Sequence, residues 1–207
     1  MSLNFAKSSF WILIISNSAN FAQYLSQLIL GRNLEVGDYG IFNAVNSLSL
    51  IVVTFVAVIP VIVSKYMIFY QDDIEFRNYL LQRISLFIYT FSFFLVLLLL
   101  LLSEQIRIFL KIESLSPIYI FIIIIFLNVI HTLYESVLQG LRRYIIYAIQ
   151  SSVLVFIRLL FILLLVVYLS HSYNAALLSQ VFATIIVLGF IYNFSRKTTR
   201  VTNKEII

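Results

Sequence analysis

The sequence predicts an all-α integral membrane protein, a six-transmembrane-helix bundle, and three observations carry this prediction. Of its 207 residues, 62% are hydrophobic and 11% are charged, whereas about a quarter of the residues in a soluble domain are charged. The hydrophobic residues fall into blocks of about 20, the length at which a helix crosses a hydrocarbon core of about 30 Å. Short connectors that carry most of the charges separate these blocks.

The blocks give six expected spans followed by a basic tail. The spans cover about residues 9–30, 39–63, 84–102, 117–138, 144–169 and 173–194, and the tail covers 195–207. The chain has no cysteine, which excludes a disulfide framework, thiol catalysis and a cysteine-based metal site. In a membrane protein the net charge of +5 reports orientation rather than a nucleic-acid partner, and none is expected.

Amide and hydroxyl side chains follow one face of the span at residues 9–30. Spacings of four, three and four residues place them within a narrow helical arc: Ser16, Asn20, Gln23 and Gln27. Because an unpaired amide that faces lipid costs free energy, this line should look into the bundle or into a wet cavity. Two interpretations stay open, which are hydrogen bonding between helices and cavity lining.

A short polar turn joins this span to the next one. Gly31 suits the position after a helix C-terminus, and Asp38 can cap the following helix. In the span at residues 39–63, a second polar line should meet the first across the hairpin: Asn43, Asn46, Ser47 and Thr54. Pro60 predicts a bend near the end of this span.

The third span has no polar face. Asp72 and Glu75 resemble a capping box, so a helix should begin there and continue into the span at residues 84–102. The stretch Leu95–Leu102 is almost pure leucine, so it should face lipid and hold no site. The connector at residues 103–116 mixes charged and apolar residues, which is typical of an amphipathic segment at the membrane interface.

The span at residues 117–138 carries a third polar arc. Its members are Asn128, His131, Thr132, Glu135 and Gln139. A metal is not expected, because no second histidine lies at a ligand spacing from His131. Two interpretations stay open, which are a hydrogen-bonded seam between helices and a proton or phosphate role for His131 and Glu135.

Arg158 lies deep inside the apolar span at residues 144–169. An arginine at such a depth costs at least about 2.5 kcal/mol on insertion scales, so it rarely faces lipid. It should point inward and meet an anion or a carboxylate. Glu135 is the internal candidate for an ion pair, although Asn128 and His131 are closer to Arg158 in depth. The alternative is that Arg158 binds an anion.

The basic residues predict that both termini are cytoplasmic. Six spans place both termini on one side, which would hold most of the cations: Lys7, Lys65, Arg77, Arg83, Arg142, Arg143 and those of the tail. The opposite side would hold Arg32, Arg107 and Lys111.

Two turns of this sequence resemble those of a known family. Residues 31–42 read Gly-Arg-Asn-Leu-Glu-Val-Gly-Asp-Tyr-Gly-Ile-Phe, and residues 139–144 read Gln-Gly-Leu-Arg-Arg-Tyr. Both are similar to turns of the polysaccharide flippases, which handle O-antigen, capsule or teichoic-acid precursors and share a superfamily with the MATE multidrug exporters. By its pattern of spans, the chain resembles the N-terminal six-span half of such a flippase.

The resemblance implies a function, a site and partners. These flippases move undecaprenyl-diphosphate-linked oligosaccharide across the bacterial inner membrane by alternating access of two lobes, with no reaction catalysed and no cofactor. Arg158 would contact the diphosphate, and side chains of the polar lines would contact the sugar: Asn20, Gln23, Gln27, Asn43, Asn46, Asn128, His131 and Glu135. The implied partners are membrane lipid, the lipid-linked oligosaccharide and a second lobe or a homodimer partner, with residues 195–207 as the start of a linker.

Other functions compete with this interpretation. A cation-coupled small-molecule exporter of the MATE type would favour an acidic cavity, and the deep arginine counts against it. A membrane scaffold without transport would use the polar lines only for helix packing. A membrane enzyme is the weakest alternative, because the connectors show no paired acidic residues, histidine clusters or glycine-rich phosphate loops.

Overall fold

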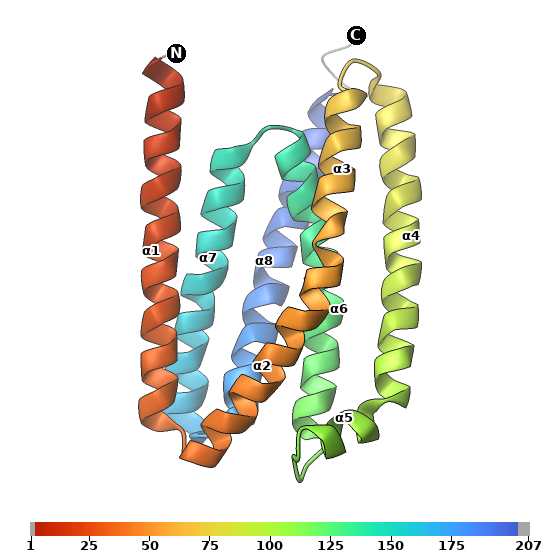
Figure 1. Cartoon of the computed structure of the whole chain (residues 1–207). Coiled ribbons are helices and arrows are strands. Elements are labelled where there is room, and N and C mark those ends of the chain that lie inside the picture. Colours follow the sequence, from red (N-terminus) through yellow and green to blue (C-terminus); the bar gives the residue numbers. More distant parts are fainter. Residues whose placement is uncertain (1–2, 203–207) are drawn as a thin grey trace.

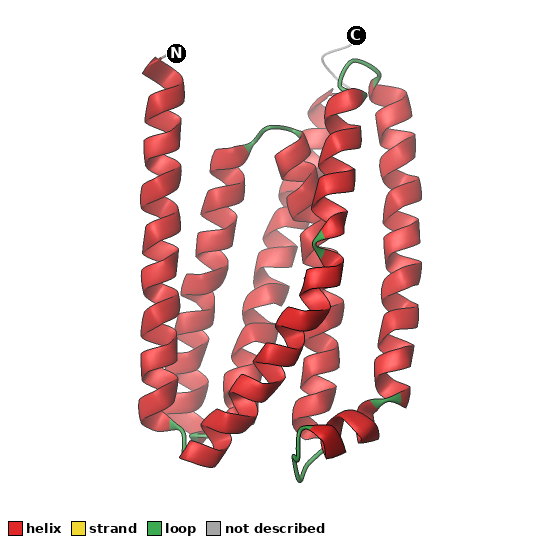
Figure 2. Cartoon of the chain, in the orientation of Figure 1, coloured by secondary structure: helices red, strands yellow, loops and turns green. Residues whose placement is uncertain are grey.

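A computed structural model describes residues 3–202 of the chain, with side chains described for residues 9–192. Helices joined by short turns account for this part of the chain (Figure 2). In order they are α1 Leu3–Asn33, α2 Val36–Val56, α3 Val58–Phe69, α4 Ile74–Leu101, α5 Ser103–Phe109, α6 Ser116–Gly140, α7 Tyr144–Ile162, the π-helix η1 Leu163–Ser170, and α8 Tyr173–Thr202.

The long helices form one bundle with α6 at its centre (Figure 1). α6 packs against α2, α3, α4 and α8, whereas α7 packs mainly between α1 and α8. Phe121 and Ile125 of α6 belong to one buried cluster with Phe42 and Val45 of α2 and with Leu177 of α8. The chain is therefore an all-α bundle in which α1 and α4 occupy opposite edges (Figure 1).

Five helical segments of the described chain are long and apolar enough to cross a membrane. They are Val36–Phe69, Ile74–Leu101, Ser116–Gly140, Tyr144–Ser170 and Tyr173–Tyr192. α1 is long enough, but its asparagine, glutamine and serine residues make it less hydrophobic than these five. The chain is thus a multi-pass membrane protein, and the span at residues 9–30 stays a prediction.

In the first hairpin, neither Gly31 nor Asp38 has the role at a helix end that the sequence predicts. α1 continues through Gly31 to Asn33, so Gly31 does not end the helix. α2 begins at Val36, which places Asp38 inside its first turn rather than at its cap. The Asp38 carboxylate instead accepts a hydrogen bond from the backbone N–H of Tyr173, at 3.4 Å, where α8 begins. Because α8 starts beside this hairpin, Asp38 serves a helix that is distant in sequence.

Pro60 bends the second span, as the sequence predicts. α2 and α3 meet at Ala57, three residues before Pro60, and their axes differ in direction (Figure 1). Proline has no backbone N–H, so the carbonyl of Val56 loses its partner four residues ahead. The regular pattern of backbone hydrogen bonds along the helix is therefore interrupted at this point.

Other ends of the expected elements also shift. α3 continues to Phe69, beyond the expected end at residue 63. The cap of α4 is Asp73, whose carboxylate accepts from the N–H of Phe76 at 3.0 Å, so the expected cap at Asp72 is wrong by one residue. α8 continues through Thr202, so the expected tail at residues 195–207 begins as helix, and its remainder lies outside the described residues.

Candidate functional site

Small residues bring α1 into close contact with α7. Ala22 and Ser26 of α1 are buried, as are Ala148 and Ser152 of α7. The Ser152 hydroxyl donates to the backbone carbonyl of Ile15 at 3.1 Å. Small side chains with a hydroxyl bond between helices are typical of packing within membranes. This contact fixes which face of α1 looks toward α7.

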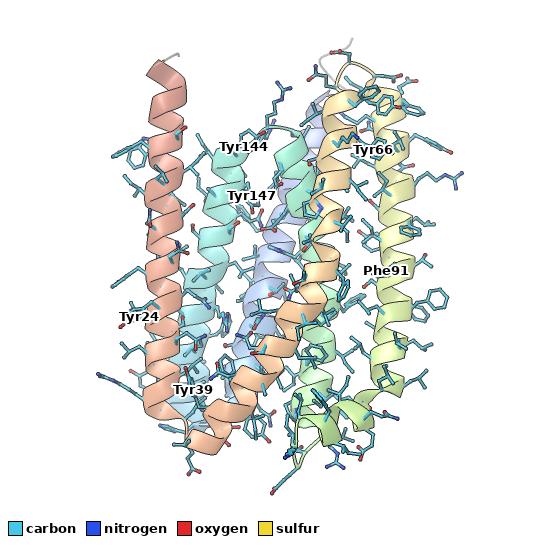
Figure 3. All side chains as sticks on the ribbon, viewed as in Figure 1. Tyr24, Tyr39, Tyr66, Phe91, Tyr144 and Tyr147 are labelled. Carbon is cyan, nitrogen blue, oxygen red and sulfur yellow. The ribbon has the colours of Figure 1, made fainter. Side chains whose placement is uncertain are left out.

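The amide line of α1 looks toward α2 instead. The Tyr39 hydroxyl of α2 donates to Gln27 Oε1 at 3.3 Å, next to the turn that joins the two helices. Figure 3 shows Tyr39 close to α1, whereas Tyr24 points away from the bundle. The contact across the hairpin is thus made at its closed end by Tyr39, which was not part of the predicted second line; no hydrogen bond joins Asn43, Asn46, Ser47 or Thr54 to a described residue of α1.

Further from the turn, the same line has no neighbouring helix to bind. α1 and α2 diverge toward their far ends (Figure 1). Gln23 is half-buried, and Asn20 is exposed. No hydrogen bond from either amide to a described residue of another helix is present. Within the described bundle, this line therefore makes one hydrogen bond between helices, through Gln27. Its other members do not bond a second helix there.

The amides of α2 lie on the face that carries Tyr39. Asn43 and Asn46 follow Tyr39 by four and seven residues, which places all three on one side of the helix. Both asparagines are half-buried. The amide nitrogen of Asn43 donates to the Tyr39 carbonyl in its own helix at 3.0 Å. These amides lie on the side of α2 that contacts the polar line of α1 through Tyr39. No hydrogen bond joins them to the described residues of that line.

A buried polar cluster joins α6 to α7. Gln150 Nε2 lies 3.0 Å from His131 Nε2 and 3.0 Å from Glu135 Oε1. The Ser151 hydroxyl also contacts Glu135 Oε1, at 3.3 Å. The predicted arc on α6 is therefore partly a hydrogen-bonded seam. Asn128, which is half-buried, lies outside this cluster.

Gln150 and Ser151 are site residues that the sequence reasoning missed. A usable signal was present, because the run Gln150-Ser151-Ser152 interrupts an otherwise apolar stretch near the start of α7. All three side chains bond a neighbouring helix, two of them to α6 and one to α1. A short polar run within an apolar helix thus marks the contact point with two neighbours.

Arg158 is buried, and no described carboxylate forms an ion pair with it. Its side chain is 7% exposed, and its Nε and Nη2 atoms are buried without a hydrogen-bond partner. The alternative of an ion pair with Glu135 is wrong, because the Glu135 carboxylate is held near Gln150 and Ser151, closer to the start of α7. An isolated charge is costly in a low-dielectric interior, so Arg158 is the strongest candidate for ligand contact.

The neighbouring bonds indicate where Arg158 points. It follows Ser151 by seven residues, about two turns, and so shares its helix face. Ser151 bonds α6, and the next residue, Ser152, bonds α1. Arg158 is therefore directed toward the region between α6 and α1.

The amides of α1 lie at the same depth as Arg158. α1 and α7 run in the same direction (Figure 1), and the Ser152–Ile15 bond sets their register. Six residues beyond Ser152, Arg158 is level with position 21 of α1, between Asn20 and Gln23. The structure thus places one guanidinium and two amides at one level of the bundle.

This combination favours a negatively charged, hydroxyl-rich ligand. A guanidinium binds phosphate oxygens through paired N–H groups, and amides both donate to and accept from sugar hydroxyls. Among the described residues, no group of three histidine or acidic side chains could hold a metal ion.

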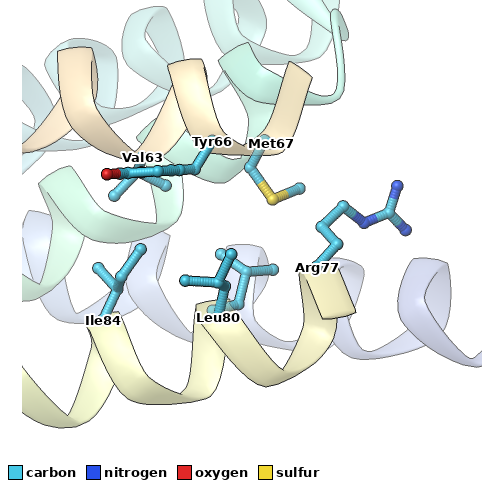
Figure 4. A pocket seen from close by; sticks show the side chains of 7 residues that line it. Val63, Tyr66, Met67, Arg77, Leu80 and Ile84 are labelled. Carbon is cyan, nitrogen blue, oxygen red and sulfur yellow. The ribbon is translucent and has the colours of Figure 1, made fainter. Parts of the chain in front are cut away.

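Three further hollows are lined mainly by apolar side chains. A groove of about 370 Å³ lies between α7 and α8, lined by Ile149, Val153 and Phe190 among others. A second, of about 300 Å³, lies between α4 and α6. Figure 4 shows the α3–α4 contact, where Val63 and Met67 face Leu80 and Ile84 while the guanidinium of Arg77 points away from them. None of these sites offers a charged group aimed at a ligand.

Comparison with known proteins supplies the family. No curated protein and no solved structure matches the chain. A family model described as polysaccharide biosynthesis protein matches residues 5–206, which is nearly the whole sequence. The match covers both turns that suggested the resemblance and every helix that forms the candidate site. The chain belongs to the polysaccharide biosynthesis protein family.

Proposed function

We propose that this chain is a lobe of a flippase that moves undecaprenyl-diphosphate-linked oligosaccharide across the bacterial cytoplasmic membrane for surface polysaccharide synthesis. The single observation that carries the proposal is Arg158, which is buried in a helix that can cross a membrane and has no counter-charge among the described side chains. A charge of this kind needs an anion. A diphosphate attached to a membrane lipid is an anion that enters from the bilayer.

The half-buried amides complete the proposed site. Gln23 of α1 and Asn43 and Asn46 of α2 would contact sugar hydroxyls, with Asn128 of α6 near the depth of Arg158. Moving the glycolipid breaks and forms no covalent bond, so no catalytic residue is needed. The protein would act as a carrier and not as an enzyme.

The exposed part of the α1 line supports a two-lobe arrangement. Asn20 and Ser16 are exposed on a helix at the edge of the bundle, where lipid is a poor partner for an amide. A second lobe, or a second copy of this chain, would cover them and enclose the site. Both termini would lie in the cytoplasm, at the basic end of the bundle.

The experiment replaces Arg158 in cells that lack the chromosomal gene and carry it on a plasmid. Arg158→Ala should abolish surface glycan while the protein reaches its normal level in the membrane. Arg158→Lys should restore part of the glycan, because lysine keeps the charge but not the paired N–H geometry. Arg83→Ala is the matched control, since Arg83 stacks over the Tyr79 ring on the exposed side of α4.

Normal surface glycan from Arg158→Ala at normal protein levels would remove Arg158 from the mechanism. Orientation is tested separately with single cysteines, which report unambiguously because the chain has none of its own. A cysteine at position 107 should react with an impermeant reagent from outside the cell, and one at position 142 should not. The reverse pattern would overturn the proposed topology.

A cation-coupled exporter is the second candidate. Glu135 is the observation in its favour, because it is an acidic group within the membrane-spanning part of α6. Arg158→Ala would then leave surface glycan unchanged, and Glu135→Gln would abolish export of a cationic dye.

A further inference from the structure

The groove between α7 and α8 opens at the surface of the bundle and has a volume of about 370 Å³. Its floor holds Val187 and Gln150, which are 1% and 2% exposed, and its rims hold Ile149 and Phe190, which are 45% and 63% exposed. The amide of Gln150 is turned toward α6, where its nitrogen donates to Glu135 Oε1 at 3.0 Å. The groove therefore presents an apolar lining on two helices that can cross a membrane.

The length of the groove matches one leaflet of a bilayer. On α7 its lining begins at Ile146 and ends at Ile157. These two residues are separated by about 16 Å of helical rise, and one leaflet supplies half of a hydrocarbon core of about 30 Å. An acyl chain of a phospholipid fits this length, whereas an undecaprenyl chain is far longer.

A basic turn lies at the end of the groove that begins with Ile146. Arg142 and Arg143 form this α6–α7 turn directly before α7, and both are exposed. The turn is at the same end of the bundle as the two termini (Figure 1). Between Glu135 and Glu205 the sequence has no acidic residue, so neither α7 nor α8 brings a carboxylate to the groove. A negatively charged group at this end therefore meets cations from the turn and no opposing charge from the groove helices.

The first turn of α7 adds to this attraction. Arg143 is the residue before the helix, and its side chain does not cap the first N–H groups. The N-terminus of a helix carries partial positive charge, and its N–H groups bind phosphate oxygens. Tyr144 at the same place is 49% exposed, and tyrosine favours the membrane interface. The start of α7 thus lies where the phosphates of membrane lipids lie.

We propose that the groove between α7 and α8 binds an acyl chain of an anionic phospholipid, whose phosphate lies against Arg142 and the start of α7. Clusters of cations at the membrane surface favour anionic lipids, and the apolar groove adds contact along the chain. This site lies on a different face of α7 from Arg158, which is directed toward α6 and α1. The inference does not depend on the proposed function, because the bound lipid is a component of the bilayer and not the carried glycolipid.

The test measures lipid selectivity with one tryptophan at the rim of the groove. Phe190→Trp is made in a Trp11→Phe background, because Trp11 is the single tryptophan of the chain. The purified variant is reconstituted in phosphatidylcholine with increasing fractions of phosphatidylglycerol, and one of the two lipids carries brominated acyl chains that quench nearby tryptophan. The quenching should show a preference for phosphatidylglycerol of roughly fivefold, the effect of one cation near a lipid surface. Added salt should lower this preference.

Three further variants separate the charge, the groove and the general membrane surface. Arg142→Gln should bring the two lipids close to equal affinity. Val153→Phe adds bulk to the groove lining without changing the charge, and it should also lower the preference. Arg83→Gln removes an exposed cation from α4 at the same end of the bundle, so it should leave the preference unchanged. A reporter at Phe91→Trp, 46% exposed on α4, should show no preference.

Equal quenching by the two lipids at Phe190→Trp would overturn the proposal. So would a preference that persists in Val153→Phe, because charge alone would then explain the selectivity. If Val153→Phe does not fold, Ile186→Phe on the α8 side of the groove makes the same test. Unbrominated undecaprenyl phosphate is then added as a competitor. If it restores the fluorescence at lower fractions than unbrominated phosphatidylglycerol does, the groove holds the chain of the carried lipid and the proposal fails. None of these results alters the test of Arg158, which is read from surface glycan.

Discussion

α6 and α4 are both long apolar helices that can cross a membrane, yet they occupy opposite environments. α6 packs against four long helices and is buried along most of its length. α4 contacts mainly α6, and Leu97, Leu98, Leu100 and Leu101 at its end are exposed. The most apolar stretch of α4 is nevertheless more hydrophobic than that of α6. In a bilayer the most apolar helix gains nothing by moving inward, because lipid is as apolar as a protein core.

Polar residues decide the difference between the two helices. α6 carries His131 and Glu135, which bond α7, whereas the buried polar side chain in the membrane part of α4 is Ser92. α6 also ends in Gly140, which permits close contact with α3. The central position of α6 thus follows from groups that need protein partners and from a small residue that lets a neighbour approach.

A large effect is expected where α6 meets α3. A Cβ at position 140 would overlap the side chain of Met67 and lie 3.3 Å from the Cα of Ser64. Gly140→Ala should therefore lower the stability in detergent by about 1–3 kcal/mol, measured as a drop in the thermal midpoint. Gly40→Ala is the control, because a Cβ there meets nothing within 4 Å. Equal midpoints for the two variants would contradict the close packing of α6.

Two leucines compare the helices directly. Leu133 of α6 is 2% exposed and Leu98 of α4 is 52% exposed. Leu133→Ala should cost about 2 kcal/mol or more because it leaves a cavity, and Leu98→Ala should cost much less because lipid fills the space. Chemical denaturation in mixed micelles measures both. A larger loss for Leu98→Ala would show that α4 is covered by protein in the assembled state.

A smaller effect is expected for the hydroxyl contact that links the two helices. Tyr89 of α4 and Tyr134 of α6 lie 3.4 Å apart at their hydroxyl oxygens. Tyr89→Phe should cost about 0.6 kcal/mol, the average for such bonds within membranes. The control is Tyr24→Phe, because Tyr24 is exposed on α1 and points away from the bundle. If Tyr89→Phe destabilises as much as Leu133→Ala, then α4 depends on polar contacts rather than on packing.

The smallest effect is expected beyond the end of α4, where α5 leaves the bundle. The Arg107 guanidinium hydrogen-bonds the Glu104 carboxylate and holds the pKa of Glu104 below its usual value. A lowered pKa in the folded state means that the pair stabilises above the ordinary glutamate pKa and that this contribution is lost as pH falls through the lowered value. Water screens both groups, so Glu104→Gln should leave the thermal midpoint unchanged. Carboxyl NMR should show the Glu104 pKa rising in Arg107→Gln, and an unchanged pKa would mean that the pair does not form.

Much of the fold could be read from local patterns. The bend at Pro60 was predicted, because it depends on one residue. The expectation that the whole stretch Leu95–Leu102 faces lipid was only partly right: Leu97, Leu98, Leu100 and Leu101 are exposed, but Leu99 is buried against the core. The ends of helices were less predictable. Asp38 has the residue type of a cap for its own helix, but it accepts from Tyr173 135 positions later. A capping residue can serve whichever N–H the fold brings near.

The sequence by itself determined that this protein is an all-α membrane bundle with amides and one arginine inside apolar helices, because helix length, hydropathy and residue spacing are local properties. Only the tertiary structure decided which of those polar groups meet. It joined Glu135 to Gln150 and Ser151, gave Arg158 no counter-charge from the described part of the chain and set Arg158 level with the amides of α1. The physical reason is that partners follow from helix rotation and depth, which packing between distant segments fixes.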